Sequence, residues 1–96
     1  MKEVVVIFAI IKANIGSEEI LFEELLKLVV LSKKEIGNIS YELHRDNNDP
    51  SMFIMHEVWE DAKAIEKHMN SIHFSAFKLG SVNILDSLSV KETTKV

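Results

Sequence analysis

The sequence predicts a single α+β domain with an antiparallel sheet, and three observations carry this prediction. The chain has 96 residues, which is close to the usual size of one domain. Short runs typical of strands alternate with longer stretches of helical periodicity. Two of the strand-like runs are separated by a turn so short that they must pair as a hairpin, which makes the sheet antiparallel. We therefore expect residues 1–96 to form one domain.

Composition places the chain among ordinary globular proteins, with 47% hydrophobic and 27% charged residues. There is no cysteine, which excludes disulfides, thiolate nucleophiles and Cys-based metal centres and fits a reducing cytoplasm. The net charge of −4 comes without a basic cluster, so we expect no nucleic-acid partner. The apolar run Val4–Ile11 is far too short to span a bilayer as a helix, so we expect no membrane partner and a cytoplasmic location.

The first strand is predicted from Val4–Ile11, which is rich in β-branched residues and apolar at successive positions. A strand of this kind is covered on both faces, but the helices of a small α+β domain cover only one face of its sheet. The simplest cover for the other face is a second copy of the same sheet, related by a two-fold axis. Burial alone therefore predicts a face-to-face homodimer.

The first helix follows a turn at Gly16, with Ser17 as its expected N-cap. We expect the helix to run from Glu18 to Glu35, with Gly37 as the residue that ends it. Its apolar positions recur at helical spacing. They are Leu21, Phe22, Leu25, Leu28 and Val29.

Two alternating runs come next, joined by a turn that contains Pro50. In the first run Ile39, Tyr41 and Leu43 are expected to share one face of a strand. The second run, Ser51–Glu60, alternates in the same way and forms the hairpin with the first. The residues expected to share one of its faces are Phe53, Met55, Glu57 and Trp59.

The second helix is predicted to begin after Asp61 and to stop at Asn70–Ser71, where a new N-cap starts a third helix, Ile72 to Leu79. A last strand is expected around Leu88–Glu92. The order is strand, helix, strand, strand, helix, strand, with an extra helical segment before the last strand. This is the order of the ferredoxin-like split βαβ sandwich, an antiparallel sheet with helices on one face.

Two histidines lie five residues apart in the helical stretch IEKHMNSIHFSAF. His68 follows Ile65 by three residues and lies beside the core-facing side of the helix; it is either a proton acceptor or a buried residue that bonds a strand group. His73 begins the third helix and either enters a pocket or caps the break. On one continuous helix the two would stand about 140° apart, so no metal site made from both is expected.

Further residues are candidates for a binding pocket. Glu57 shares a strand face with apolar residues, so it must find partners or change its proton affinity; it orients a catalytic histidine, acts as acid or base, or is structural. Tyr41 either donates a hydrogen bond to a substrate oxygen or packs in the sheet. Trp59 is a pocket wall or part of the core. Phe74 lines the pocket or, with Phe77, closes the core beneath the third helix.

An ordered set of residues in the second half of the chain matches a known pattern. The matching pieces are Gly37, Ser40-Tyr41-Glu42, the Asp49-Pro50 turn, Phe53, Glu57-x-Trp59, His68, and Ser71-x-His73-Phe74 with Phe77. With these spacings the chain resembles the antibiotic biosynthesis monooxygenase family, which includes small quinol monooxygenases of bacteria. The resemblance implies a dimeric α+β barrel with a pocket between the helices and the sheet of each subunit.

The resemblance also implies a function, because characterised relatives oxidise electron-rich aromatics such as hydroquinones and anthrones with dioxygen. They need neither metal nor flavin, since a phenolate or enolate formed in an apolar pocket can itself give an electron to oxygen. We therefore expect a cofactor-independent monooxygenase acting on a quinol-like or polyketide aromatic. The residues expected to serve it are His68 and Glu57 in catalysis, and Tyr41, Trp59, His73 and Phe74 in substrate binding.

Two other functions fit the same pattern. An isomerase or lyase acting on a small hydroxyketone needs the same base and pocket but no oxygen. A non-catalytic dimeric barrel would bind a small ligand or serve another protein. Oxygen consumption with substrate separates the first function from these two.

Overall fold

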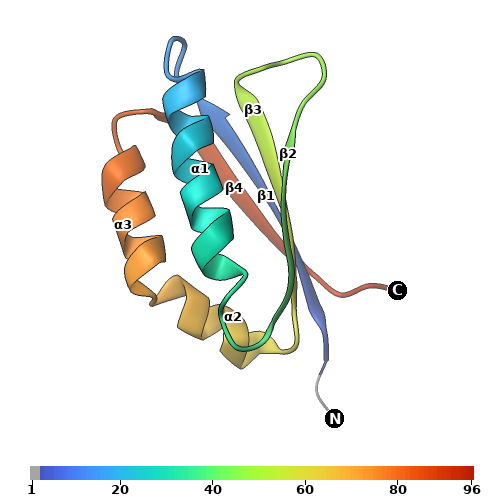
Figure 1. The fold of residues 1–96 in the computed structure, drawn as a ribbon. Helices are drawn as coiled ribbons and strands as arrows, with labels where there is room; N and C mark the ends of the chain where they lie inside the picture. Colours follow the sequence, from blue (N-terminus) through green and yellow to red (C-terminus); the bar gives the residue numbers. More distant parts are fainter. Residues whose placement is uncertain (1–2) are drawn as a thin grey trace.

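The computed structural model describes residues 3–96 and consists of a four-stranded antiparallel sheet and three helices (Figure 1). The strands are β1 (Val5–Ala13), β2 (Asn38–Arg45), β3 (Met52–Trp59) and β4 (Leu85–Thr93). The helices are α1 (Glu18–Ser32), α2 (Ala62–Met69) and α3 (Ile72–Ser81). The strands lie in the order β2-β3-β1-β4, so the predicted ferredoxin-like fold is confirmed.

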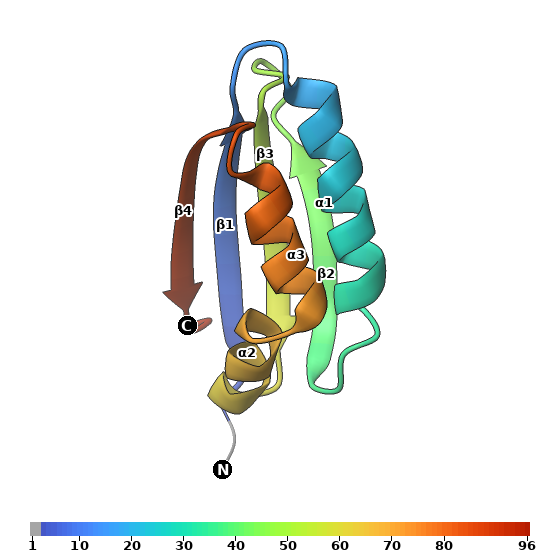
Figure 2. The same ribbon diagram turned by 90° about the vertical axis from the view of Figure 1, so that its left-hand side faces the viewer.

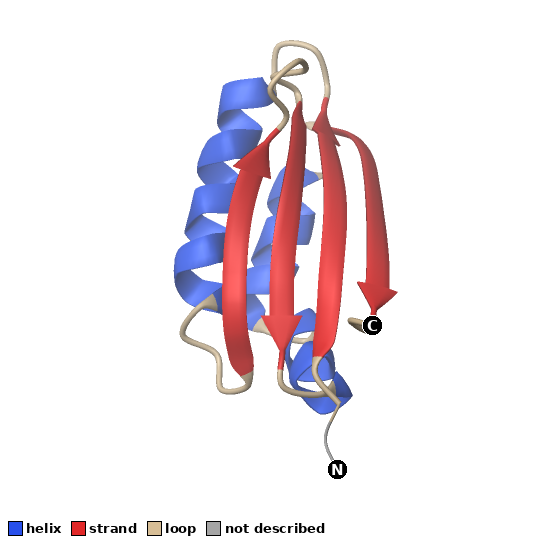
Figure 3. Cartoon of the chain, turned by 90° about the vertical axis from the view of Figure 1, so that its right-hand side faces the viewer, coloured by secondary structure: helices blue, strands red, loops and turns tan. Residues whose placement is uncertain are grey.

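The molecule has two layers. Figure 2 shows α1 and α3 side by side over the sheet, and Figure 3 shows the opposite face of the sheet without a helix. Within β1, Ile7 and Ile11 are buried under the helices, whereas Phe8 and Ile10 on the other face are 40% and 37% exposed. As expected for a small α+β domain, the described helices cover one face of the sheet only, and the cover predicted for the other face, a second copy of the chain, stays a prediction.

The hairpin of β2 and β3 follows the prediction except at one residue. The four alternate residues of β3 that were expected to share a face are all buried. Tyr41 pairs with Glu57 and is buried beside them. Ile39, however, is 57% exposed, because the register shifts between Asn38 and Ser40. The expected common face of β2 is therefore wrong at Ile39.

Helix α1 ends at Ser32, three residues before the Glu35 predicted from periodicity. Residues 33–37 form turns instead, and Gly37 closes them with a φ of +92°. This backbone conformation favours glycine, and a Cβ at Gly37 would also come within 2.6 Å of Ala64 Cβ. Gly37 is thus a turn residue before β2 rather than the residue that ends α1, and the turn removes Glu35 from the helix.

The break between α2 and α3 occurs where the sequence predicts it. Asp61 caps α2 by accepting a hydrogen bond from the Ala64 backbone N–H at 2.9 Å. Ser71 caps α3 by accepting one from the Phe74 backbone N–H at 3.2 Å, and its own hydroxyl donates to the His68 carbonyl at 2.7 Å. The bonds of Ser71 thus mark the break between α2 and α3, whereas the Asp61 cap marks the start of α2.

Several element ends differ from the prediction, and β1 runs from Val5 to Ala13 rather than from Val4 to Ile11. Ser17 stands at the N-cap of α1 without a side-chain capping bond, and the Glu18 carboxylate accepts from the Gly16 N–H at 2.7 Å instead. Helix α3 continues to Ser81, so Gly80 lies within it and does not end it. Strand β4 is longer than expected because it pairs with β1 along most of that strand.

Among the described residues, no helix combines the length and apolarity needed to cross a bilayer.

Candidate functional site

One carboxylate oxygen joins the two histidines. Oε2 of Glu35 lies 2.6 Å from Nδ1 of His68 and 2.8 Å from Nε2 of His73. An ionised carboxylate only accepts hydrogen bonds, so each of these ring nitrogens carries a proton and donates it to the same oxygen. Glu35 comes from the turn after α1, His68 from α2 and His73 from the first turn of α3, so three segments meet at this point.

The separation expected for the two histidines on one continuous helix does not apply, because α2 and α3 are separate helices. The ring centroids of His68 and His73 are 6.0 Å apart. The bend at Ser71 turns α3 so that its first residues face the end of α2. The predicted break between the helices is confirmed, and because of this break the two rings come together.

His68 is buried among aromatic rings, with 2% of its surface exposed. Its ring centroid lies 4.8 Å from that of Trp59, 5.0 Å from that of Phe74 and 5.5 Å from that of Tyr41. Burial lowers the pKa of His68, although the hydrogen bond to Glu35 acts in the opposite direction. The neutral ring that burial favours carries its proton on Nδ1, where Glu35 accepts it, and therefore keeps a lone pair on Nε2.

A cavity of about 40 Å³ lies between the sheet and the helices next to His68. Its ionisable lining residues are Tyr41, Glu57 and His68, and the remainder of its wall is apolar. The volume is enough for a water molecule but far below the roughly 300 Å³ of the smaller ligand pockets. The side chains that close it on the helix side and on the β4 side are Met69, Phe74, Phe77, Leu88 and Val90.

Glu57 is the second carboxyl group of the site and is 5% exposed. Trp59 Nε1–H donates a hydrogen bond to Glu57 Oε1 at 2.9 Å. Burial raises the pKa of Glu57 to about 7 in spite of this bond, and the charge of Glu35 acts in the same direction as burial. Near neutral pH the Glu57 carboxyl is therefore present in both protonation states. The carboxylate that bonds His68 is Glu35, so Glu57 does not have the orienting role considered for it.

Tyr41 is held in the protonated form. Burial raises the pKa of its hydroxyl above the ordinary value, and the charge of Glu57 raises it further. Its ring meets that of Trp59 edge to face, with centroids 6.2 Å apart. Tyr41 therefore lines the cavity as a neutral phenol, and Trp59 packs against its ring.

The structure brings most of the predicted site residues together. Trp59 is fully buried and supports Tyr41, Glu57 and His68, but it is not among the residues that line the cavity. His73 likewise lies outside the lining, where it bonds Glu35. The predicted residues that do line the cavity are Tyr41, Glu57, His68 and Phe74.

Glu35 is the site residue that sequence reasoning missed. The helical periodicity of α1 was extended through it, which made it an ordinary residue at the end of a surface helix. The one signal in the sequence is its place two residues before Gly37, because glycine is typical of a tight turn. The turn was predicted, but the direction in which it would send the Glu35 side chain was not.

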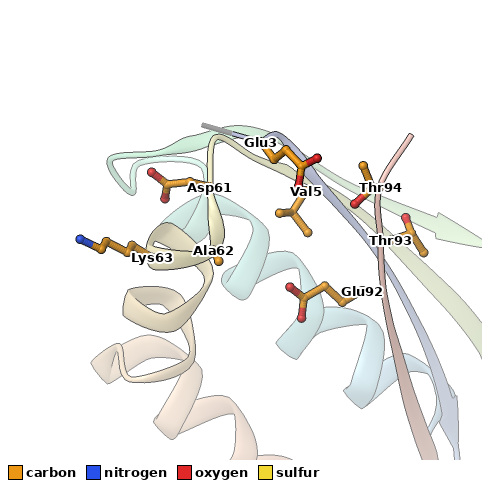
Figure 4. Close-up of a pocket in the computed structure, with 8 residues that line it drawn as sticks. All are labelled: Glu3, Val5, Asp61, Ala62, Lys63, Glu92, Thr93 and Thr94. Atoms are coloured by element: carbon orange, nitrogen blue, oxygen red, sulfur yellow. The ribbon is translucent and has the colours of Figure 1, made fainter. Parts of the chain in front are cut away.

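A larger depression, of about 850 Å³, lies where β1 begins and β4 ends (Figure 4). Figure 4 shows its three carboxylates pointing in different directions around a space that is open to solvent. An exposed acidic surface of this kind holds no buried group that could be poised for chemistry. Its lining residues are Glu3, Val5, Asp61, Ala62, Lys63, Glu92, Thr93 and Thr94.

Comparison with known proteins identifies the family. Residues 4–78 match the family model described as "Antibiotic biosynthesis monooxygenase". The chain belongs to this family. A relative from Bacillus subtilis (strain 168), named "Putative monooxygenase YcnE", is 33% identical over 73 residues, which are 76% of this chain and 77% of that protein. The resemblance stated from the sequence is therefore confirmed.

Solved structures share the fold. The crystal structure of PA3566 from Pseudomonas aeruginosa is 34% identical, with a TM-score of 0.96 over 100% of this chain and 97% of that one. A structure from Nitrosomonas europaea, described as "Putative antibiotic biosynthesis monooxygenase", has a TM-score of 0.93 over 100% of this chain and 93% of that one. At 14% identity the second likeness shows the fold alone.

Proposed function

We propose that this member of the antibiotic biosynthesis monooxygenase family is a cofactor-independent monooxygenase that oxidises a quinol-like or polyketide aromatic with dioxygen. One observation carries the proposal: an imidazole held by a carboxylate stands at the wall of an apolar cavity. The family and the name of the Bacillus subtilis relative support the reaction class.

In this proposal His68 is the general base. Its Nδ1–H is held by Glu35 at 2.6 Å, so Nε2 is the ring nitrogen left to take the acidic proton of the substrate. The positive charge that then forms on the ring is stabilised by the adjacent Glu35 carboxylate. A positioned base of this kind contributes about 10²–10⁴-fold to the rate.

The oxygen step follows from the anion that His68 creates. The phenolate or enolate gives one electron to dioxygen, and the resulting carbon radical and superoxide join to form a C–O bond. Cleavage of the O–O bond with loss of water leaves one oxygen atom in the product as a carbonyl and the other in the water. An apolar, water-poor cavity favours this sequence because it protects the radical pair from side reactions.

Glu57 and Tyr41 complete the proposed site. With its pKa raised to about 7, Glu57 can supply the proton that the departing water needs. The Tyr41 phenol donates a hydrogen bond to a substrate oxygen. Because the cavity measures only about 40 Å³, an aromatic substrate must displace side chains at its wall. Met69, which is 43% exposed at the end of α2, has a long unbranched side chain that can move aside.

We also propose that the uncovered face of the sheet binds the same face of a second copy. Its centre is apolar: Phe8 and Ile10 of β1 are exposed, and Ile54 and Val58 of β3 pair next to them. An apolar face of this kind is typical of a surface covered in an oligomer. Sedimentation should give a dimer for the wild type and a monomer for Phe8→Glu. A wild-type chain that stays monomeric at micromolar concentration would contradict the dimer.

Oxygen uptake by metal-stripped protein, measured against a panel of hydroquinones and anthrones, tests the function. We expect uptake above autoxidation in the wild type and a loss of about 100-fold or more in His68→Ala. Glu35→Gln should also lose activity, because Gln keeps the shape of the carboxylate but not its charge. His44→Ala is the matched control, since His44 is an exposed histidine on β2.

Two results would reject the monooxygenase. One is the absence of uptake with every substrate on the panel. The other is uptake that His68→Ala leaves unchanged. Anaerobic exchange of a carbon-bound substrate proton, without oxygen uptake, would instead support the isomerase reading, because enolate formation needs only the base.

A further inference from the structure

We propose that Glu35, His68 and His73 form a binding site for a divalent transition-metal ion of the zinc class. One ligand atom from each residue is available, and the three atoms lie within 4.8 Å of one another. Two imidazole nitrogens and a carboxylate oxygen are ligands that Zn²⁺ takes in proteins, with water in a fourth position.

The two rings already converge on one point. Nδ1 of His68 and Nε2 of His73 both face Oε2 of Glu35, at 2.6 and 2.8 Å. Zn–N bonds are about 2.0–2.1 Å long, so an ion bound by both nitrogens would stand close to the place that Oε2 now takes. Glu35 would remain a ligand if its carboxylate stepped back by about 2 Å, the length of a Zn–O bond.

Metal binding requires Glu35 and His73 to move, and both residues have room to do so. Glu35 has a long side chain and lies in a turn rather than in a helix. In a tetrahedral site the two nitrogens would be about 3.4 Å apart. Because they now lie within 4.8 Å of each other, His73 needs to approach His68 by no more than about 1.4 Å. The His73 side chain, in the first turn of α3, is 19% exposed and is free to shift, whereas that of His68 is 2% exposed and forms a fixed floor.

Access and ligand chemistry select the ion. The Glu35 and His73 side chains are 15% and 19% exposed, so an ion can reach the cluster from solvent without entering the cavity. Imidazole ligands favour Zn²⁺, Cu²⁺ and Ni²⁺, whereas Mg²⁺ and Ca²⁺ require mostly oxygen ligands. We therefore expect zinc to bind and magnesium not to bind.

The consequence for His68 follows from its single lone pair. A neutral imidazole has one protonated nitrogen and one free nitrogen. An ion on Nδ1 moves the ring proton to Nε2, and Nε2 can then no longer accept a proton from a substrate. Bound metal would thus inhibit the enzyme rather than serve it. This consequence rests on the proposed function, whereas metal binding itself does not.

Isothermal titration calorimetry tests the binding, with ZnCl₂ added to EDTA-treated, substrate-free full-length protein in a non-coordinating buffer. We expect one ion per chain for the wild type and no heat with MgCl₂. Removing a residue that only hydrogen-bonds a metal ligand lowers metal affinity by about 10–100-fold. Removing a ligand itself, as in His73→Ala or Glu35→Gln, should lower zinc affinity at least as much. His44→Ala is the control and should bind like the wild type.

Thermal unfolding gives a second readout that a poorly folded variant cannot imitate. Zinc should raise the Tm of the wild type and of His44→Ala and leave that of Glu35→Gln unchanged. Two results would overturn the proposal. One is that the wild type does not bind zinc, and the other is that His73→Ala and Glu35→Gln bind zinc as tightly as the wild type does. Zinc binding without oxygen uptake would keep the metal site and reject the monooxygenase; oxygen uptake without zinc binding would do the reverse.

Discussion

The two faces of the sheet are formed by the same strands, but one face is buried and the other is exposed. On the inner face, β3 presents Phe53 and Trp59, both 0% exposed, to the helices. On the outer face, Phe8 of β1 is 40% exposed and lies against the ring of His56, with centroids 5.2 Å apart. Residues one position apart along a strand therefore experience a packed interior and open solvent.

The two faces therefore suit different roles: the inner face suits a reactive site, and the outer face suits the binding of a partner chain. Every ionisable residue that lines the cavity lies on the inner side, where burial alters proton affinity, as it does for Glu57. On the outer face His56 Nδ1 lies 3.8 Å from Glu42 Oε1, and the two side chains are 32% and 60% exposed. The inner face can thus hold a reactive site, while the outer face remains available for a partner chain.

The largest expected effect compares one phenylalanine on each face. Phe53→Ala should lower the free energy of unfolding by about 3–5 kcal/mol, because it leaves a cavity in the packed core. Phe8→Ala should cost much less at low protein concentration, and its cost should grow with concentration if the outer face binds a second copy. Urea unfolding of both variants at two protein concentrations measures the difference. Equal costs at low concentration would remove the distinction between the faces.

The pH dependence of stability sharpens the comparison at Glu57. Its pKa in the folded chain is about 7, against an ordinary value of 4.5, so folding favours the protonated carboxyl. The resulting stability is complete below pH 4.5 and is lost as the pH rises through about 7. With 1.36 kcal/mol for each tenfold change in proton affinity, the loss should be about 3 kcal/mol.

Glu57→Gln, which carries no ionisable group, is the reference for this measurement. Chemical unfolding between pH 4 and 8 should show the wild type losing stability relative to the variant as the pH rises. A difference between the two proteins that does not change with pH would mean that Glu57 titrates normally in the folded chain.

The smallest expected effect concerns the cap that separates α2 from α3. Ser71→Ala removes the hydroxyl that accepts from the Phe74 N–H and should cost about 1 kcal/mol. Ser89→Ala, an exposed serine on β4, should change stability by less than about 0.5 kcal/mol. Thermal unfolding compares the two. If the two substitutions change stability by the same amount, the helix break does not depend on the Ser71 cap.

Much of the fold was predictable because local patterns dictate it. Period-2 alternation gave β3 with all its inward residues, and the pair Asn70–Ser71 gave the break between α2 and α3. The predictions were wrong where contacts with residues distant in the sequence override the local pattern. The register shift that exposes Ile39 depends on pairing with β3, and the turn at Gly37 lies so close to Ala64 that a Cβ would not fit there.

The candidate site was predictable only in part, for the same reason. His68 was recognisable because it lies beside the core-facing side of a helix, and Glu57 because it is a carboxylate within an apolar strand pattern. Glu35 was not recognisable, because its role depends on a turn that directs it toward residues much later in the chain. No periodicity within α1 contains that information.

The Glu35 contact also bears on the order in which the chain folds. Its hydrogen-bond partners His68 and His73 are 33 and 38 residues away along the sequence. The hairpin of β2 and β3 lies between them and forms from neighbouring residues, so it can fold before the ends of this long loop meet. We therefore expect the carboxylate–histidine cluster to form after this hairpin during folding.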